Sequence, residues 1–209
     1  MQQADALLEK PQRGRPRDPF LEQRVFDAAA RVYGGHGWAG FNFDAVAREA
    51  GVGKAAIYAR WAKRADLLLA MIVARWQSLS DINTGSLCGD LTAFAELTLE
   101  RYSSTNGRIP MHLRLDTKNY AEVAAALGPL LRDMNQKCVN IIKHAAERGE
   151  IAADTDQRLI PAILTATIER IAADAKGAAS VERERTQVAA LVAIILNGCL
   201  NNPEQGNES

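Results

Sequence analysis

The stretch that decides the fold covers residues 43–68 and reads FDAVAREAGVGKAAIYARWAKRADLL. Val46-Ala47 marks the inward face of one short helix, and Ile57 is the inward residue of a second helix. Between them, Ala50-Gly51-Val52 predicts a tight turn in which Gly51 is free to adopt a positive φ and the valine plugs the core. A helix, a tight turn and a second helix form the arrangement that places the second helix in the major groove of DNA.

The second helix carries side chains suited to a groove. Its small residues would let the backbone approach closely, and their methyl groups could touch thymine methyls. The lysine and arginine can reach phosphates or guanine edges, and the tyrosine hydroxyl can contact a phosphate. The alternative is a short helical hairpin inside an ordinary α-helical domain. The predicted contact residues on this helix are Lys54, Ala55, Ala56, Tyr58, Ala59 and Arg60.

Helical signals continue upstream and downstream of this stretch. Asp18-Pro19 is a helix start, and apolar residues at helical spacing predict a first helix over 19–33. The run GGHG at 34–37 is expected to stop it. Asn42 should cap the second helix, which ends at residue 50; the third helix covers 54–61, and a fourth starts near Arg64.

The rest of the chain is predicted to be helical as well, with the polar stretch 81–90 as its expected boundary feature. Asp154 and Gln157 have the spacing of a capping box ahead of a helix over 159–173, and a last helix covers 181–199. No alternation with a period of two appears, so the fold class is all-α.

The last two long helices are apolar on more than one face. Such helices must be buried on two sides, one against their own core and the other against a partner. An identical subunit is the commonest partner, which predicts a homodimer through these helices. The alternative is a position in the middle of a larger monomeric core. The residues concerned are Leu159, Ile160, Ile163, Leu164, Ala166, Thr167, Ile168 and Ile171, then Val188, Ala190, Leu191, Val192, Ile194, Ile195 and Leu196.

Composition narrows the class of protein. Residues 1–65 hold 11 Lys and Arg against 7 Asp and Glu, and the remainder of the chain has the same excess of acidic residues. This asymmetry is expected if only the N-terminal part contacts a polyanion. Cys88, Cys138 and Cys199 have no spacing for zinc or a disulfide framework. The longest apolar run is about half the ~20 residues that a membrane span needs, and no signal peptide is found, so a cytoplasmic protein is expected.

Catalytic and metal-binding motifs are absent from the sequence. His36, His112 and His144 have no second ligand at metal-binding spacing. There is no nucleotide-binding glycine loop and no nucleophile elbow. Neither an enzyme nor a bound cofactor or metal is therefore predicted.

The segment from Arg13 to about Leu69 resembles the N-terminal domain of TetR-family (TetR/AcrR-type) transcription regulators. The residues that carry the resemblance are Gly14-Arg15-Pro16-Arg17, Gly37, Phe41, Val46-Ala47, Ala50-Gly51-Val52, Ile57-Tyr58, Trp61 and Leu67. Two positions depart from the family pattern. Gly53 replaces a serine at the cap of the recognition helix, and Ala59 removes a side chain that often reads bases.

The resemblance implies a homodimer whose last two helices pair with their mates in a four-helix bundle. It also implies a roughly palindromic DNA operator, and often release by a small molecule held in the helical body. By the same resemblance Asn42 touches the DNA backbone as well as capping its helix, and Arg64 stands where the family has a basic residue at the start of the fourth helix. The implied function is a transcription regulator, most often a repressor.

Four regions follow from these patterns: a basic arm over 1–17, a DNA-binding domain over 18–64, a regulatory and dimerisation domain over 65–200, and a tail over 201–209. Three arginines of the arm could enter an adjacent minor groove, or simply add non-specific affinity for the polyanion. They are Arg13, Arg15 and Arg17.

The body offers a set of residues that could line an effector pocket, although an ordinary core position is the favoured interpretation for each of them. They are Tyr102, Met111, Met134, Cys138, Thr165 and Glu169. Glu169 interrupts an apolar helix; if buried it would need a cationic or hydrogen-bonding partner, and at the dimer seam it would pair with Arg170 or Arg183. The competing hypotheses are a DNA-binding regulator without small-molecule control, and a helical small-molecule-binding protein or enzyme.

Overall fold

The computed structural model describes residues 20–76, 82–103, 108–174 and 180–200. Over these ranges the chain forms nine α-helices and no strand, which confirms the all-α prediction. None of these helices is long and apolar enough to cross a membrane. The helices are α1 (Leu21–Gly40), α2 (Phe43–Ala50), α3 (Lys54–Tyr58), α4 (Arg64–Arg75), α5 (Leu87–Ser103), α6 (Ile109–Asn119), α7 (Ala121–Glu147), α8 (Leu159–Ala173) and α9 (Ser180–Leu200).

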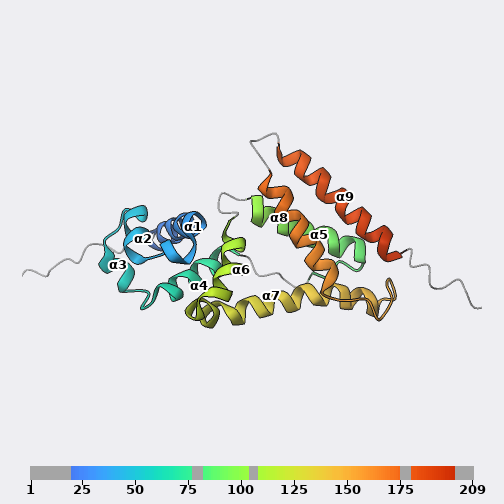
Figure 1. The fold of residues 1–209 in the computed structure, drawn as a ribbon, viewed down its shortest axis with the longest axis horizontal. Coiled ribbons are helices and arrows are strands. Elements are labelled where there is room, and N and C mark those ends of the chain that lie inside the picture. Colours follow the sequence, from blue (N-terminus) through green and yellow to red (C-terminus); the bar gives the residue numbers. More distant parts are fainter. Residues whose placement is uncertain (1–19, 77–81, 104–107, 175–179, 201–209) are drawn as a thin grey trace, which may run out of the picture.

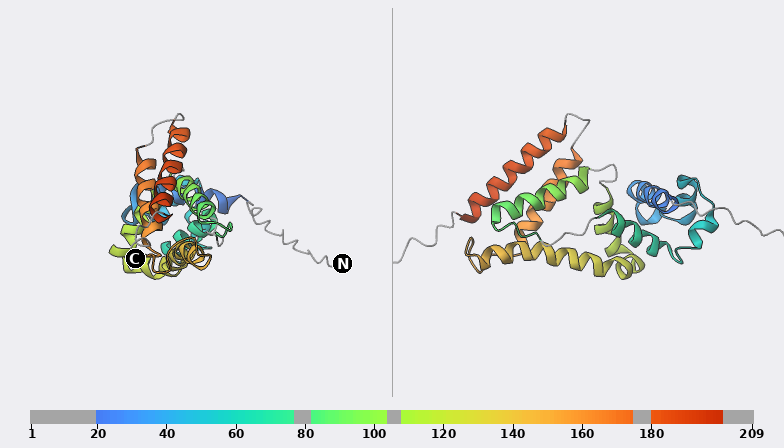
Figure 2. Two further views of the ribbon diagram at one scale, coloured as in Figure 1. Left: turned by 90° about the vertical axis from the view of Figure 1, so that its right-hand side faces the viewer. Right: turned by 180° about the vertical axis from the view of Figure 1, so that it is seen from behind.

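Two hydrophobic cores lie at opposite ends of an elongated molecule (Figure 1). The head core is formed by α1 to α4 together with α6 and the beginning of α7. The body core is formed by α5, the end of α7, α8 and α9. Helix α7 runs along the molecule from one core to the other, contributing Val123 and Leu127 to the first and Ile141 and Ile142 to the second (Figure 2).

Packing divides the chain differently from the predicted domain boundary between residues 64 and 65. That boundary falls at the first residue of α4, whereas the head core takes in Leu67, Leu68 and Met71 of this helix. It also takes in Ile109 and Leu113 of α6. The predicted boundary remains a hypothesis about independent folding, since apolar side chains cross it.

The prediction that α1 ends at Tyr33 is wrong. The helix continues through Gly34 and Gly35, and its backbone breaks at Gly37, where φ is 59° and ψ is −163°. Only glycine adopts such a conformation without strain, and a Cβ at this position would lie 2.8 Å from Nδ1 of His112. Tertiary packing against α6 therefore sets the end of α1, and the earlier glycines are accommodated as helix.

Two further local predictions need correction. Helix α3 ends at Tyr58 rather than at residue 61, although a helical hydrogen bond of 3.0 Å still joins the Trp61 amide to the Ile57 carbonyl. The capping box of Asp154 and Gln157 does not form, because α8 begins after Arg158 without a side-chain cap. Asp156 takes over part of that role, and its Oδ1 accepts from the Arg158 amide at 2.8 Å.

A buried polar clamp ties the start of α5 to the end of α7. The carboxylate of Asp90 is fully buried and accepts from Arg148 Nη2 at 2.9 Å and from Thr84 Oγ1 at 2.8 Å. Glu150 also binds Arg148 and accepts from the Leu87 amide at 2.6 Å. Burial opposes ionisation of Glu150, but these two donors together lower its pKa below the usual value. The polar stretch predicted as a boundary thus ends in a structured helix start.

Candidate nucleic-acid interface and effector region

The turn between α2 and α3 has the geometry that its sequence predicts. Asn42 caps α2, with its Oδ1 accepting from the Ala45 amide at 2.8 Å. Gly51 ends the helix in the left-handed conformation, with φ of 64° and ψ of 36°. The Val52 amide then donates to the Ala47 carbonyl at 3.0 Å, and its side chain packs against the head core. The predictions for the cap, the glycine and the valine are confirmed.

Helix α3 is anchored by one side chain and presents most of the others to solvent. Ile57 is fully buried in the head core, whereas Tyr58 is 58% exposed. The ring of Tyr58 packs edge-on against Phe43 of α2, with 4.9 Å between centroids. The remaining predicted contact residues are exposed, except for Ala56, which is half-buried; these exposed residues are Lys54, Ala55, Ala59 and Arg60.

The polar groups of this surface are engaged within the protein. Lys54 Nζ lies 2.7 Å from Asp44 Oδ2, and both side chains are about 60% exposed. Arg60 Nη1 donates to the Ala56 carbonyl at 3.1 Å. The Asn42 amide donates to the Gly40 carbonyl at 3.2 Å. Because these bonds are solvent-exposed and weak, a phosphate can replace them at little cost.

Arg64 has a position that sequence reasoning did not predict. Its Nη1 donates to the carbonyls of Trp38 and Phe41, at 3.3 and 3.0 Å, and its guanidinium lies 3.9 Å over the Trp38 ring. Its Nη2 binds Glu122 Oε1 of α7 at 2.7 Å. The described bonds of Arg64 thus join α1, α4 and α7, so its predicted DNA contact would require their exchange. The neighbouring Lys63, which was not among the predicted contact residues, has an exposed side chain at the start of α4.

A second polar junction connects α1 to α6. Oδ2 of Asp116, which is almost buried, accepts from the Tyr33 hydroxyl at 2.8 Å and from the Trp38 amide at 2.9 Å. Burial, and then the hydrogen bond and charge of Asp116, raise the pKa of Tyr33 far above its usual value. The hydroxyl therefore stays a donor, and α6 is fixed to the end of α1 where Gly37 breaks the helix.

Three of the helices around the predicted effector region meet through polar side chains. Glu169 of α8 is 21% exposed and pairs with Arg114 of α6 at 3.2 Å. Burial raises the pKa of Tyr102 of α5 to about 12, with the charge of Glu169 and a hydrogen bond to it adding to the effect. The expectation of a cationic partner for Glu169 is met, but the partner is Arg114, whereas Arg170 pairs with Asp174.

The other predicted pocket residues are half-buried, and their grouping into one cavity stays a prediction. Burial raises the pKa of the Cys138 thiol to about 11, so the thiol is protonated at neutral pH, while the charge of Arg101 acts in the opposite direction. A groove between α5 and α9 lies elsewhere in the body, and none of the six residues lines it. The residues not yet placed are Met111, Met134 and Thr165, on α6, α7 and α8.

The arginines of the predicted arm, Arg13, Arg15 and Arg17, fall outside the described residues. Within them, no group of three or more metal-ligating side chains comes together.

Comparison with known proteins supports this geometry. Residues 25–71 match the family described as bacterial regulatory proteins, tetR family, and residues 81–171 match the tetracyclin repressor-like C-terminal domain. The chain is 28% identical over 150 residues to the HTH-type transcriptional regulator AqdR of Rhodococcus erythropolis, covering 71% of this chain and 72% of AqdR. It is also 28% identical over 144 residues to an uncharacterised HTH-type regulator of Mycobacterium tuberculosis, covering 66% and 71%.

Solved structures share the fold. Salmonella enterica GusR superimposes with a TM-score of 0.65 at 18% identity, covering 90% of this chain and 99% of its own. Bacillus subtilis FadR, solved with stearoyl-CoA, gives a TM-score of 0.62 at 17% identity, covering 86% and 97%. A regulator from Saccharomonospora viridis, solved with choline, gives 0.60 at 16%, covering 82% and 95%.

The capped α2, the left-handed turn and the exposed face of α3 define a helix-turn-helix DNA-binding transcription regulator. Its N-terminal and C-terminal halves match the same family in order along the chain. The protein belongs to the TetR family, a family of regulators rather than enzymes.

Proposed function

We propose that this regulator is a homodimeric repressor that binds a palindromic operator and is released by a small molecule bound in its body. The observation that carries the proposal is helix α6, which holds groups facing both the head and the effector region. Asp116 bonds to α1, and Arg114, two residues earlier, pairs with Glu169 of α8. A ligand that displaces the Arg114 side chain would therefore act on the helix that fixes the end of α1.

The DNA contacts in this proposal come from the exposed face of α3. Lys54, Arg60 and Tyr58 would hold phosphates or guanine edges, while the alanines allow close approach to the groove. Lys63 adds a phosphate contact at the start of α4, and Asn42 one at the start of α2. The exposure of these side chains and the small size of Ala55 and Ala59 support this assignment.

The dimer would form through the exposed apolar faces of α8 and α9. Three large apolar side chains on these helices are exposed: Leu159 by 55%, Ile163 by 41% and Ile194 by 69%. Ile163 follows Leu159 by four residues, so the two lie on one face of α8. Figure 2 shows α8 and α9 next to each other in the body, with α9 on the side away from the head. Covering this apolar surface with a second copy would remove it from water.

The effector would bind where α5, α6 and α8 meet at Tyr102, Arg114 and Glu169. This site offers a hydroxyl, a guanidinium and a carboxylate beside half-buried apolar side chains. FadR and the Saccharomonospora regulator, which share the fold, were solved with stearoyl-CoA and choline, so proteins of this fold bind small molecules. A ligand that prefers one spacing of the two heads would shift the dimer away from the operator spacing of about 34–36 Å.

The test is selection of genomic fragments by the purified protein, followed by affinity measurements against salt. A recovered palindrome bound tightly and with strong salt dependence supports the proposal. Sedimentation of a chain truncated before Val181 should show loss of the dimer, and a stable truncated dimer would refute the α8–α9 seam. If no fragment is enriched over random DNA at low or moderate salt, the free protein is not a repressor of this kind.

The effector is tested separately. Candidate small molecules made or consumed by products of genes beside the operator are titrated into the protein–operator complex. Release by one of them, weakened by Arg114→Ala, supports the proposed route through α6. Release that is unchanged in that variant contradicts the route but leaves operator binding intact.

A further inference from the structure

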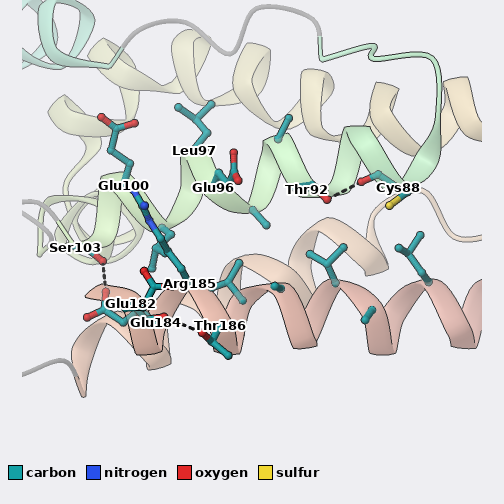
Figure 3. A pocket seen from close by; sticks show the side chains of 18 residues that line it. Cys88, Thr92, Glu96, Leu97, Glu100, Ser103, Glu182, Glu184, Arg185 and Thr186 are labelled. Atoms are coloured by element: carbon teal, nitrogen blue, oxygen red, sulfur yellow. Dashed lines mark hydrogen bonds between the residues drawn. The ribbon is translucent and has the colours of Figure 1, made fainter. Parts of the chain in front are cut away.

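A groove of about 1180 Å³ runs between α5 and α9 on a flank of the body. The two helices lie side by side in opposite directions, so Cys88 stands at one end of the groove and Ser103 at the other (Figure 3). None of the residues that line it belongs to the Tyr102–Arg114–Glu169 meeting point. We propose that this groove is a second ligand site, which binds small amphiphiles that carry a cationic head and an apolar tail.

The groove is chemically divided along its length. Its α9 wall is apolar toward the Cys88 end, where it is made by Val188, Ala189, Val192, Ala193 and Leu196. Small side chains also occur opposite on α5, with Ala93 and Thr92. Such a wall removes an alkyl or aromatic tail from water without filling the groove itself.

The other part of the groove is acidic. Four carboxylates line it against one guanidinium, that of Arg185; they belong to Glu96, Glu100, Glu182 and Glu184. Figure 3 places Glu100, Glu182 and Glu184 around the Ser103 end. This excess of negative charge favours a cation over an anion, because a groove with low-dielectric walls concentrates the field of its charged residues.

Glu184 is held in place at the acidic end of the groove by its burial and by a hydrogen bond. Its side chain is 2% exposed, and its Oε2 accepts from the Ser103 hydroxyl at 2.7 Å, which links α9 to the last residue of α5. The hydroxyl donates to this carboxylate, so the bond orients Glu184 at the Ser103 end of the groove. A ligand ammonium arriving at this end meets a carboxylate whose position is already fixed.

The groove is distinct from the proposed dimer seam. Successive helical residues point about 100° apart, so Ala189, which lines the groove, and Ala190 face different sides of α9. Ala190 and the exposed Ile194, four residues apart, share the other side. One helix therefore offers neighbouring positions at which the ligand site and the subunit interface can be perturbed separately.

The experiment uses the full-length protein and two probes of equal chain length, decyltrimethylammonium and decyl sulfate, each kept below its micelle concentration. Isothermal titration calorimetry should give saturable binding of the cation and at least tenfold weaker binding of the anion. The double variant Glu96→Gln/Glu100→Gln, which changes two exposed side chains, should weaken binding of the cation about tenfold. Glu147→Gln, at the exposed end of α7, is the matched control and should leave it unchanged.

Cys88 gives a readout at the groove itself. In a Cys199→Ser background the exposed Cys88 should react with a maleimide far faster than Cys138, which is half-buried and whose pKa is raised by burial. Decyltrimethylammonium should slow the reaction of Cys88. Ala189→Trp should abolish both the binding and the protection while the dimer persists in sedimentation. Ala190→Trp should weaken the dimer and leave the probe bound.

Several results would overturn the proposal: equal binding of the two probes, no saturable binding of the cation, or binding that survives Ala189→Trp. Loss of the dimer in Ala189→Trp would instead make the groove a subunit interface, which also refutes a ligand site. Operator affinity, measured on the same variants, keeps this outcome separate from the function proposed above, because the groove can bind or fail to bind the probe in a regulator that still recognises its DNA.

Discussion

The head core and the body core solve the same packing problem with different side chains. Six buried aromatic residues fill the head core: Phe26, Tyr33, Trp38, Phe41, Phe43 and Trp61. The body core has one, Phe94, among aliphatic side chains. Large rings interlock short helices at fixed angles, which suits a head that must hold α3 rigidly. The aliphatic body, held by the polar clamp, has a groove between α5 and α9 and exposed apolar side chains on α8 and α9.

The largest expected effect on the free energy of unfolding comes from removing an aromatic ring from the head core. Trp38→Ala would remove a fully buried ring that also stacks under Arg64 and donates to Glu122 at 2.8 Å. We expect unfolding to become easier by about 3–5 kcal/mol. Urea titration followed by tryptophan fluorescence measures it, since the remaining Trp61 and Trp76 both pack against the head core.

The same titration followed by circular dichroism shows whether the two cores unfold together. If the fluorescence transition of Trp38→Ala moves to lower urea than the dichroism transition, the cores are separate cooperative units joined by α7. Coincident transitions would show that the head core and the body core unfold as one cooperative unit. Val73→Ala, on the exposed face of α4, is the control and should change stability by less than about 0.5 kcal/mol.

The body core should respond most to its polar clamp. Asp90→Asn would leave Arg148 without its fully buried carboxylate partner, and we expect a loss of about 2–3 kcal/mol, less than for a completely buried pair because Arg148 is 25% exposed. Dichroism at 222 nm in a thermal scan measures the loss. Asp133→Asn, whose ion pair with Lys137 lies on the outside of α7, should have almost no effect. Equal effects of the two substitutions would refute the clamp.

The head could be predicted from the sequence more completely than the body. The head could be predicted because its signals are local: a capping Asn42, a turn at Gly51 that requires a positive φ, and one inward Ile57. The end of α1 could not, since Gly34 and Gly37 look alike in sequence and only the approach of α6 distinguishes them. In the body the helices were predicted, but the partners of Glu169 and Asp90 lie 55 and 58 residues away along the chain. Spacing along one helix carries no information on such contacts.

A smaller effect is expected on the DNA-binding face of the head. Tyr58→Phe removes only a hydroxyl, and if that hydroxyl contacts a phosphate, binding should weaken by about 0.5–1.5 kcal/mol for every sequence alike. Competition binding with the operator and with random DNA measures both affinities. A changed base preference would contradict the phosphate role. Lys54→Ala should in addition lower the slope of log affinity against log salt by about one, which marks the loss of a phosphate contact.

The smallest effect lies on the surface of the head, where Glu122 at the start of α7 binds Arg64 of α4. The hydrogen bond from Arg64, and then that from Trp38, lower the pKa of Glu122 below its usual 4.5. A carboxyl with a depressed pKa stabilises the folded state at pH values above 4.5, and this contribution disappears as the pH falls through the lower, folded-state pKa. Wild type and Glu122→Gln should therefore differ in melting temperature at pH 7, and the difference should disappear as the pH falls through the folded-state pKa, which lies below 4.5. In an Arg64→Gln background the difference should shrink, because the larger of the two donors that lower the pKa is gone and only the hydrogen bond from Trp38 remains. A difference that persists well below the folded-state pKa would mean that Glu122 acts through its shape and hydrogen bonds and not through its charge.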